Sequence, residues 1–145
     1  MRMLTTIVFA SILVLGCKAG DNTSDMKTTQ DDGPTVYVLD VMPGGPDIPT
    51  DARPTIQIED GRVTGFAGCN RYNGPIEMTE NAVSIGPLAA TKMYCADKMD
   101  LETAFLQRLQ NADVFMDLGE DLMFEADGEL TLYFIRQTPA PDEKE

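Results

Sequence analysis

The hydrophobic positions of residues 35–136 alternate with polar positions over short runs, and turn-forming residues separate these runs. Alternation with a period of two is typical of strands that bury one face. The runs comprise residues 36–41, 55–58, 63–67, 76–78, 83–85, 114–118, 122–125 and 130–135. The pattern therefore predicts about seven or eight short antiparallel strands.

Turn chemistry sets the breaks between these strands. Asp-Gly pairs at 60–61 and 127–128 predict tight hairpins. Residues 42–54 contain four Pro and two Gly, which predicts a loop. Asn73-Gly74-Pro75 predicts a further turn, and Gly86-Pro87 is expected to end the strand before it.

Residues 97–112 have a different period and predict the single helix. Apolar side chains recur there at helical spacing and give one buried face. They are Leu101, Ala104, Phe105, Leu109 and Ala112. Asp97 is expected to cap the N-terminus, and acidic residues in the first turns suit the helix dipole.

These elements together predict a β-rich α+β domain. Its architecture is expected to be a small curved antiparallel sheet or a partly open barrel, with the helix covering one side. The final run, 130–135, is apolar on both faces, which is typical of a central or covered strand. Nine Met residues leave two interpretations, a core filled by soft side chains or a Met-lined cavity for a hydrophobic ligand.

The N-terminus carries a different signal. Residues 1–16 are typical of a secretory signal peptide, because Arg2 precedes an apolar run at residues 4–15 that is shorter than a membrane span. The run ends in Val14-Leu15-Gly16-Cys17, which resembles a bacterial lipobox, so we expect a lipid on Cys17. The alternative, an ordinary signal with Cys17 in a disulfide, leaves an odd cysteine unexplained.

The flanking segments have little to bury. Residues 17–34 are polar and predict a flexible linker, and residues 137–145 predict a disordered tail around a domain at 35–136. The multiple acyl chains of a bacterial lipoprotein suffice for stable anchoring, so the membrane is the expected partner. Lys18 stands where enterobacterial sorting signals place Asp for inner-membrane retention. By that resemblance the protein is expected in the outer membrane, facing the periplasm.

Composition narrows the function classes. The chain has 24 acidic and 11 basic residues, which argues against nucleic-acid binding. It has no His, so Ser-His and Cys-His nucleophile pairs are impossible within it. The acidic clusters lack the register of a calcium loop and are expected to be turns. We therefore expect no enzyme activity, no cofactor and no metal, although two carboxylates could in principle act as a glycosidase pair.

Two segments carry a recognisable signature. Residues 68–74 read GCNRYNG, and residues 85–95 read IGPLAATKMYC. Together they resemble the META domain family, which includes HslJ-like heat-shock lipoproteins of bacteria. The signature positions are Gly68, Cys69, Asn70, Arg71, Tyr72, Gly86, Pro87, Leu88, Thr91, Lys92, Met93 and Cys95. The resemblance implies the same β-rich fold. The family's usual Trp in the first strand is missing, and Tyr37 is expected in its place.

Cys69 and Cys95 have two interpretations. In an oxidising compartment a structural disulfide is the default, and with Cys17 lipidated these two remain as an even pair. The alternative is a thiol redox site, although the Cys-x-x-Cys spacing is missing.

The polar signature residues also have two interpretations. Arg71 could bind a carboxylate of a ligand or partner through its guanidinium group. The structural interpretation, which we favour, places Asn70 in a backbone-bonding turn and Arg71 in an ion pair with a carboxylate of the domain. Lys92 has the same two interpretations.

The expected function is a non-catalytic, membrane-tethered envelope protein with an interaction or stress-tolerance role. Its partner could be an unidentified envelope protein or a hydrophobic ligand. The alternative is an acidic periplasmic inhibitor of a basic enzyme such as lysozyme, because a net charge of −13 would steer a cationic target.

Overall fold

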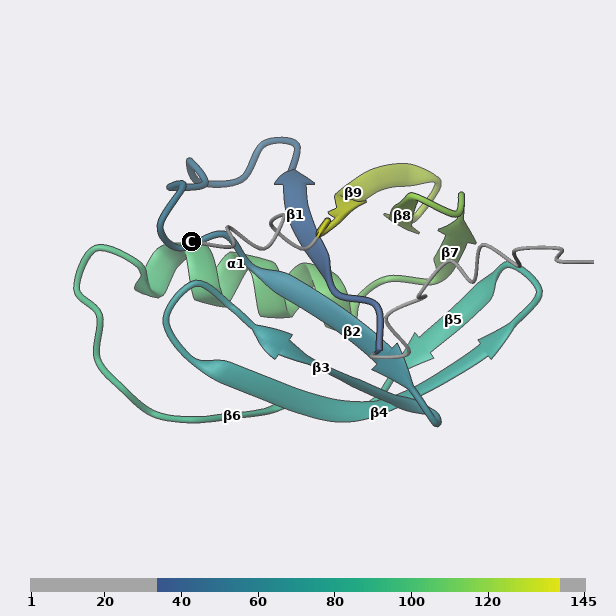
Figure 1. Ribbon diagram of the computed structural model, residues 1–145, viewed down its shortest axis with the longest axis horizontal. Helices are drawn as coiled ribbons and strands as arrows, with labels where there is room; N and C mark the ends of the chain where they lie inside the picture. Colours follow the sequence, from purple (N-terminus) through teal and green to yellow (C-terminus); the bar gives the residue numbers. More distant parts are fainter. Residues whose placement is uncertain (1–33, 139–145) are drawn as a thin grey trace, which may run out of the picture. The chain divides into compact units, whose positions relative to one another are not determined.

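The computed structural model describes residues 34–138. The predicted signal peptide, Cys17, nearly all of the linker and most of the C-terminal tail lie outside the described residues. The elements are β1 (Tyr37–Val41), β2 (Thr55–Glu59), β3 (Arg62–Phe66), β4 (Arg71–Thr79), β5 (Ala82–Ile85), β6 (Ala89–Ala90), α1 (Met99–Gln110), β7 (Val114–Asp117), β8 (Asp121–Ala126) and β9 (Glu129–Arg136) (Figure 1). Between residues 34 and 138, no helix is long and apolar enough to cross a membrane.

Eight of these strands close into an antiparallel barrel. The sheet order is β3-β2-β1-β9-β8-β7-β5-β4-β6, and an additional pairing of β3 with β4 completes the ring. The short β6 lies outside the ring, paired to β4. The β-rich α+β class is confirmed, and the barrel is closed where the sequence allowed a partly open one. The strand pairing between β5 and β7 is short, with Ala82 opposite Val114.

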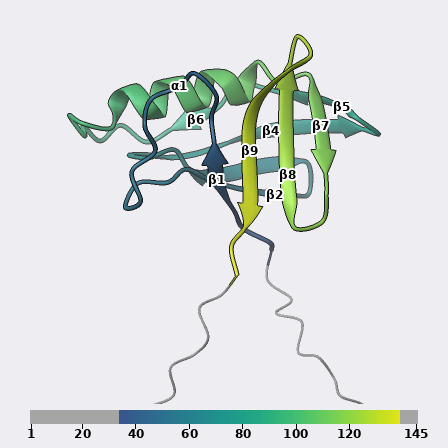
Figure 2. The ribbon, with the colours of Figure 1, turned by 90° about the horizontal axis from the view of Figure 1, so that it is seen from above.

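The helix α1 lies across one end of the barrel, over the ends of β1, β9 and β8 (Figure 2). Its buried residues include Leu101, Phe105 and Leu109, which confirms the predicted face. Phe105 is fully buried, with its ring centroid 5.5 Å from that of Tyr72 and 6.2 Å from that of Phe134. Aromatic rings thus link the helix to both sides of the barrel.

The predicted turn at Asn73-Gly74-Pro75 is wrong, because all three residues lie inside β4. Gly74 is there for space rather than for a turn. A Cβ at this position would lie 2.7 Å from Cδ2 of Leu88. The strand therefore needs glycine where the segment before β6 crosses it closely.

The Asp-Gly turns are as predicted. Asp60 and Gly61 have φ values of 48° and 70°, and Asp127 and Gly128 have φ values of 55° and 78°. Positive φ at both central residues is the requirement of a type I′ hairpin, and the strands on either side pair accordingly.

The start of the helix differs from the prediction. Lys98, not Asp97, occupies the N-cap position, and no side chain caps the helix there. The Lys98 ammonium group is instead 2.7 Å from a carboxylate oxygen of Asp51 in the loop before β2. The acidic residues of the first turn, Asp100 and Glu102, are present as expected.

Neither interpretation of the methionines is supported. Within the described residues, Met42 is the one methionine of the buried core, while Met78 and Met93 are exposed. The largest fully buried side chains are mainly aromatic and branched aliphatic: Phe105, Phe124, Phe134, Leu39, Ile56, Leu109, Leu132 and Val63. Rigid side chains with few rotamers therefore fill the interior.

Candidate functional site

The sheet register brings the two signature segments together. Tyr72 in β4 pairs with Ala90 in β6, and the Thr91 amide donates to the Arg71 carbonyl at 3.0 Å. The disulfide between Cys69 and Cys95 joins the outer ends of the same segments, with the two Cα atoms 6.0 Å apart. The predicted pairing of these cysteines is confirmed.

Asn70 is the hydrogen-bonding centre of this region. Its side-chain oxygen accepts from the Thr91 hydroxyl at 2.9 Å and from the Met93 amide at 2.7 Å. Its Nδ2 group donates to the Met93 carbonyl at 3.0 Å. Asn70 thus bonds backbone as predicted, but the backbone belongs to the other signature segment rather than to its own turn.

The sequence analysis missed the partner of Asn70, which is Glu102 on α1. Nδ2 of Asn70 lies 3.1 and 3.0 Å from the two carboxylate oxygens of Glu102, and the Asn70 amide lies 2.8 Å from Oε2. Only 7% of Glu102 is exposed. The spacing of Glu102 from Phe105 and Leu109 could have placed it at the border of the buried face. We call the assembly of Asn70, Thr91, Met93 and Glu102 the Asn70 clasp.

Several other signature residues also have structural roles. Gly68 has a φ of +103°, which favours glycine, and a Cβ there would lie 3.1 Å from Leu101. A Cβ on Gly86 would lie 2.6 Å from the ring of Pro75. Tyr72 is buried and donates its hydroxyl to the Thr55 carbonyl at 2.9 Å, and burial raises the pKa of this phenol.

Other signature side chains point to solvent. Arg71, Lys92 and Met93 are exposed, as is the neighbouring Tyr94, at 84%. Within residues 34–138, neither Arg71 nor Lys92 has a carboxylate within 4.0 Å, so their predicted ion pairs are wrong. The ion pairs found there are Arg53–Asp40, Lys98–Asp51 and Arg136–Glu120.

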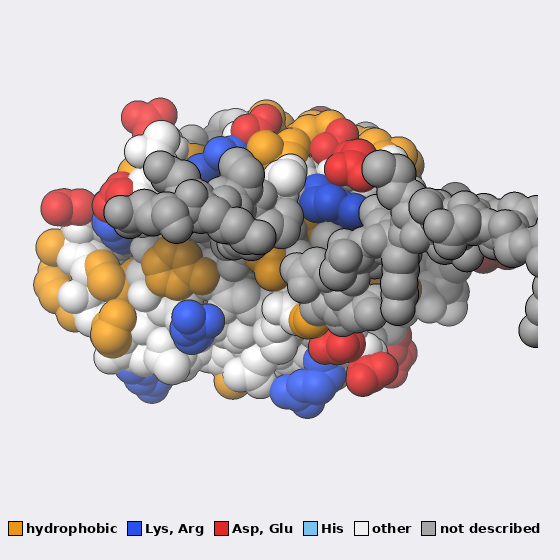
Figure 3. Space-filling view, viewed as in Figure 1, with side chains coloured by type: hydrophobic (Ala, Val, Ile, Leu, Met, Phe, Trp, Pro, Cys, Tyr) orange, Lys and Arg blue, Asp and Glu red, His pale blue; other side chains and the backbone are white. Residues whose placement is uncertain are grey.

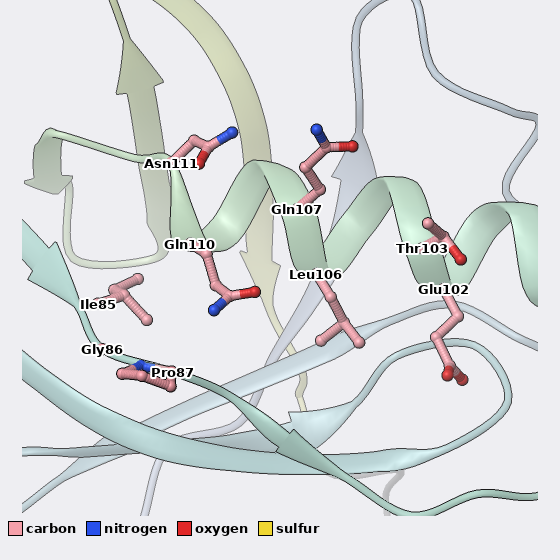
Figure 4. A pocket seen from close by; sticks show the side chains of 9 residues that line it. All are labelled: Ile85, Gly86, Pro87, Glu102, Thr103, Leu106, Gln107, Gln110 and Asn111. Carbon is pink, nitrogen blue, oxygen red and sulfur yellow. The ribbon is translucent and has the colours of Figure 1, made fainter.

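One hollow of about 670 Å³ lies between α1 and the end of β5. In Figure 4 the side chains of Glu102, Leu106 and Gln110 point from one side of α1, whereas Gln107 and Asn111 point from the other. The signature residues Gly86 and Pro87 form part of the opposite wall. The Glu102 carboxylate, which lines this hollow, is already hydrogen-bonded to Asn70.

A second hollow of about 530 Å³ lies on the outer surface of β2, β3 and β4, and Arg71 is one of its lining residues. Among the described residues, no group of three or more His, Cys, Asp or Glu side chains could hold a metal ion. The arrangement around the signature can therefore present groups for binding on a fixed backbone.

Removing the disulfide should lower the stability of the domain without unfolding it. The bridge spans 26 residues, for which the chain-entropy model gives about 3.5 kcal/mol. The Cys69→Ala, Cys95→Ala double variant is expected to lose about that much and still form the sheet and helix. Thermal unfolding of wild type with and without reductant measures the loss. An unchanged midpoint, with reduction verified by mass spectrometry, would show that the bridge does not stabilise the fold.

Comparisons with known proteins agree with this architecture. The sequence model of the META domain matches residues 31–139. A solved structure described as the NMR structure of the protein from Burkholderia xenovorans is 27% identical, with a TM-score of 0.59, covering 72% of this chain and 83% of that one. A second NMR structure shares the fold at 21% identity, with a TM-score of 0.54 and coverage of 70% and 87%. Among curated proteins, none matches the sequence significantly.

Proposed function

This chain belongs to the META domain family, and from that premise we propose that it is a non-catalytic binding protein of the bacterial cell envelope. In this proposal a lipid on Cys17 tethers it to the membrane, and the domain contacts an envelope component during stress. The sequence supplies no His, and therefore no histidine-activated nucleophile.

The observation that supports a binding role is that some signature residues are buried and structural whereas others are charged and exposed. The buried polar atoms of Asn70 and Glu102 form the hydrogen bonds that hold the two segments together. The charged side chains of Arg71 and Lys92 stand exposed on that fixed support. Because the backbone that carries them is already fixed, binding a ligand here requires no ordering of the main chain, which favours recognition.

The tether follows from the sequence before the domain. The Leu15-Gly16-Cys17 segment resembles a lipobox, and the polar residues 18–34 would span roughly 20–25 Å as a flexible chain. That reach would hold the domain clear of the lipid headgroups. By resemblance to enterobacterial sorting signals, Lys18 favours the periplasmic face of the outer membrane.

Cys17→Ser should abolish membrane attachment, because only the thiol accepts the lipid. We expect the variant in the soluble fraction or as an uncleaved precursor, measured by fractionation and intact mass. Lys18→Gln, which changes the next residue and keeps the thiol, should remain with membranes. Mature wild-type protein that is wholly soluble and carries no acyl mass would contradict the tether.

The inhibitor alternative rests on a narrower basis. It draws on the net charge of −13, which would attract any cationic protein. The envelope-binding proposal also draws on the signature and on the exposed groups that the Asn70 clasp supports. We therefore propose binding to an envelope component rather than inhibition of a basic enzyme such as lysozyme.

A further inference from the structure

The outer face of β2, β3 and β4 carries an ordered set of polar side chains. Thr64 in β3 pairs with Gln57 in β2 and with Asn73 in β4, so these three residues form one row across the strands. Phe66 pairs with Arg71 in a second row on the same face. Cross-strand partners lie close together on one side of a sheet, so the two rows form a continuous surface.

This surface is hollowed into the groove of about 530 Å³, a volume within the usual range of small-molecule sites. Its lining residues are Val36, Thr55, Gln57, Thr64, Gly65, Phe66, Arg71, Tyr72, Asn73 and Gln137. A Cβ on Gly65 would lie 2.0 Å from the Thr55 carbonyl oxygen. Glycine there lets β2 and β3 approach closely at the groove.

The charge of the groove is opposite to that of the chain. The sequence has 24 Asp and Glu residues, yet none of the groove's described lining residues is acidic. Arg71 supplies a positive charge and has no ion pair within residues 34–138. In Figure 3 the lower left of the visible face, over β3, β4 and β6, shows Lys and Arg side chains and no Asp or Glu. Along β2, the next outward position after Gln57 is Glu59, which lies opposite Arg62.

Some polar atoms of the groove are already engaged. The Thr55 hydroxyl accepts from the Phe66 amide at 3.1 Å, and the Asn73 side-chain oxygen accepts from Arg62 at 2.9 Å. The second interaction orients the Asn73 amide so that its two N–H donors remain available. Gln57 and Thr64 have no side-chain hydrogen bond to another described residue in the structure. The groove therefore offers neutral donors and acceptors, one guanidinium group and one half-buried aromatic ring.

We propose that this groove binds an acidic sugar. Arg71 pairs with the sugar carboxylate through its planar pair of N–H donors. Side-chain amides and hydroxyls such as those of Gln57, Thr64 and Asn73 bond ring hydroxyls, because each can both donate and accept. The Phe66 ring contacts the C–H face of the sugar. A peptide carboxylate fits less well, since a peptide has no row of hydroxyl groups to bond the side chains of Gln57, Thr64 and Asn73.

This inference extends the proposed function by naming its ligand class, and it stands or falls separately from the lipid anchor. The test is an NMR titration of the full-length, isotope-labelled chain with N-acetylmuramic acid and with glucuronic acid. N-acetylglucosamine, which lacks the carboxylate, and acetate, which lacks the sugar, serve as matched probes. We expect saturable shifts in residues 55–73 with an acidic sugar, and at least tenfold weaker binding of both matched probes. The tighter of the two acidic sugars identifies the preferred carboxylate position.

Arg71→Gln should weaken acidic-sugar binding about tenfold to a hundredfold, the value of a charged hydrogen-bonding pair. Lys98→Gln removes a cationic side chain that pairs with Asp51 and does not line the groove, and it should stay within twofold of wild type. No saturable shift with either acidic sugar would overturn the proposal. Equal binding of N-acetylglucosamine or acetate would also overturn it, as would equal losses from the two variants. The dipeptide acetyl-alanyl-alanine, titrated as a peptide carboxylate, would overturn it by binding more tightly than the acidic sugars.

Discussion

Phe105→Ala is expected to lower the free energy of unfolding by about 3–5 kcal/mol. The Phe105 side chain is fully buried and its ring meets the edges or faces of Tyr72 and Phe134. Its truncation leaves a cavity where the helix closes the end of the barrel, and the closed sheet around it has little freedom to collapse. Because small domains have total stabilities of only about 5–15 kcal/mol, this is a large fraction. Denaturant unfolding followed by circular dichroism measures it.

Gln107→Ala is the matched control on the same helix. Gln107 is exposed, two positions along from Phe105, and its side chain makes no hydrogen bond to a described residue. Its replacement should change the free energy of unfolding by less than about 0.5 kcal/mol. Equal losses from the two variants would mean that the buried face of α1 is assigned wrongly.

Asn70→Ala is expected to have an effect of similar size, about 3–5 kcal/mol. The substitution removes the donors that the buried Glu102 carboxylate accepts from the Asn70 side chain. It also removes the acceptor of the Met93 amide. Buried polar groups left without partners cost more than the hydrogen bonds themselves were worth, and a charged group costs most. Thermal and denaturant unfolding of the purified variant measure the loss.

Two further variants separate the clasp from general damage to β4. Asn73→Ala changes an exposed asparagine of β4, three residues after Asn70, and should cost less than about 1 kcal/mol. Adding Glu102→Met to Asn70→Ala should recover part of the loss, because it removes the buried carboxylate that has lost its side-chain donor. Strictly additive losses from Asn70→Ala and Glu102→Met would contradict a direct coupling of these two residues.

The strands and the helix could be predicted because their signals are local. Alternation predicted the strand runs that contain Leu39, Ile56 and Val63, which are buried in the structure, and the Asp-Gly pairs predicted hairpins through their backbone preferences. The prediction was wrong at Gly74, where the reason for glycine is the side chain of Leu88. Glycine is required both by a tight turn and by a close approach between two segments, so the sequence alone reads the same in either case. Only the folded structure distinguishes the two.

The site was predictable in its residues and not in its geometry. The cysteine pair could be expected from the sequence, on the hypothesis of an oxidising compartment and a lipid on Cys17, whereas the partner of Asn70 could not. Glu102 was assigned to the helix dipole because a carboxylate in a first turn is ordinarily solvated. Its burial depends on how α1 sits over the barrel end. The ion pairs expected for Arg71 and Lys92 failed for a related reason. Arg71 pairs with Phe66 across β3 and β4, and Lys92 follows the end of β6, so sheet pairing brings no carboxylate beside either side chain.

The central claim is that the Asn70 clasp locks the two signature segments into one rigid support. Amide hydrogen exchange of the wild-type protein tests it most directly. The Asn70 amide donates to Glu102 and the Met93 amide donates to Asn70, so both should exchange only through global unfolding. The Tyr94 amide, in the exposed loop next to Met93, should exchange quickly and serves as an internal reference. Exchange of the Asn70 and Met93 amides as fast as that of Tyr94 would contradict the account.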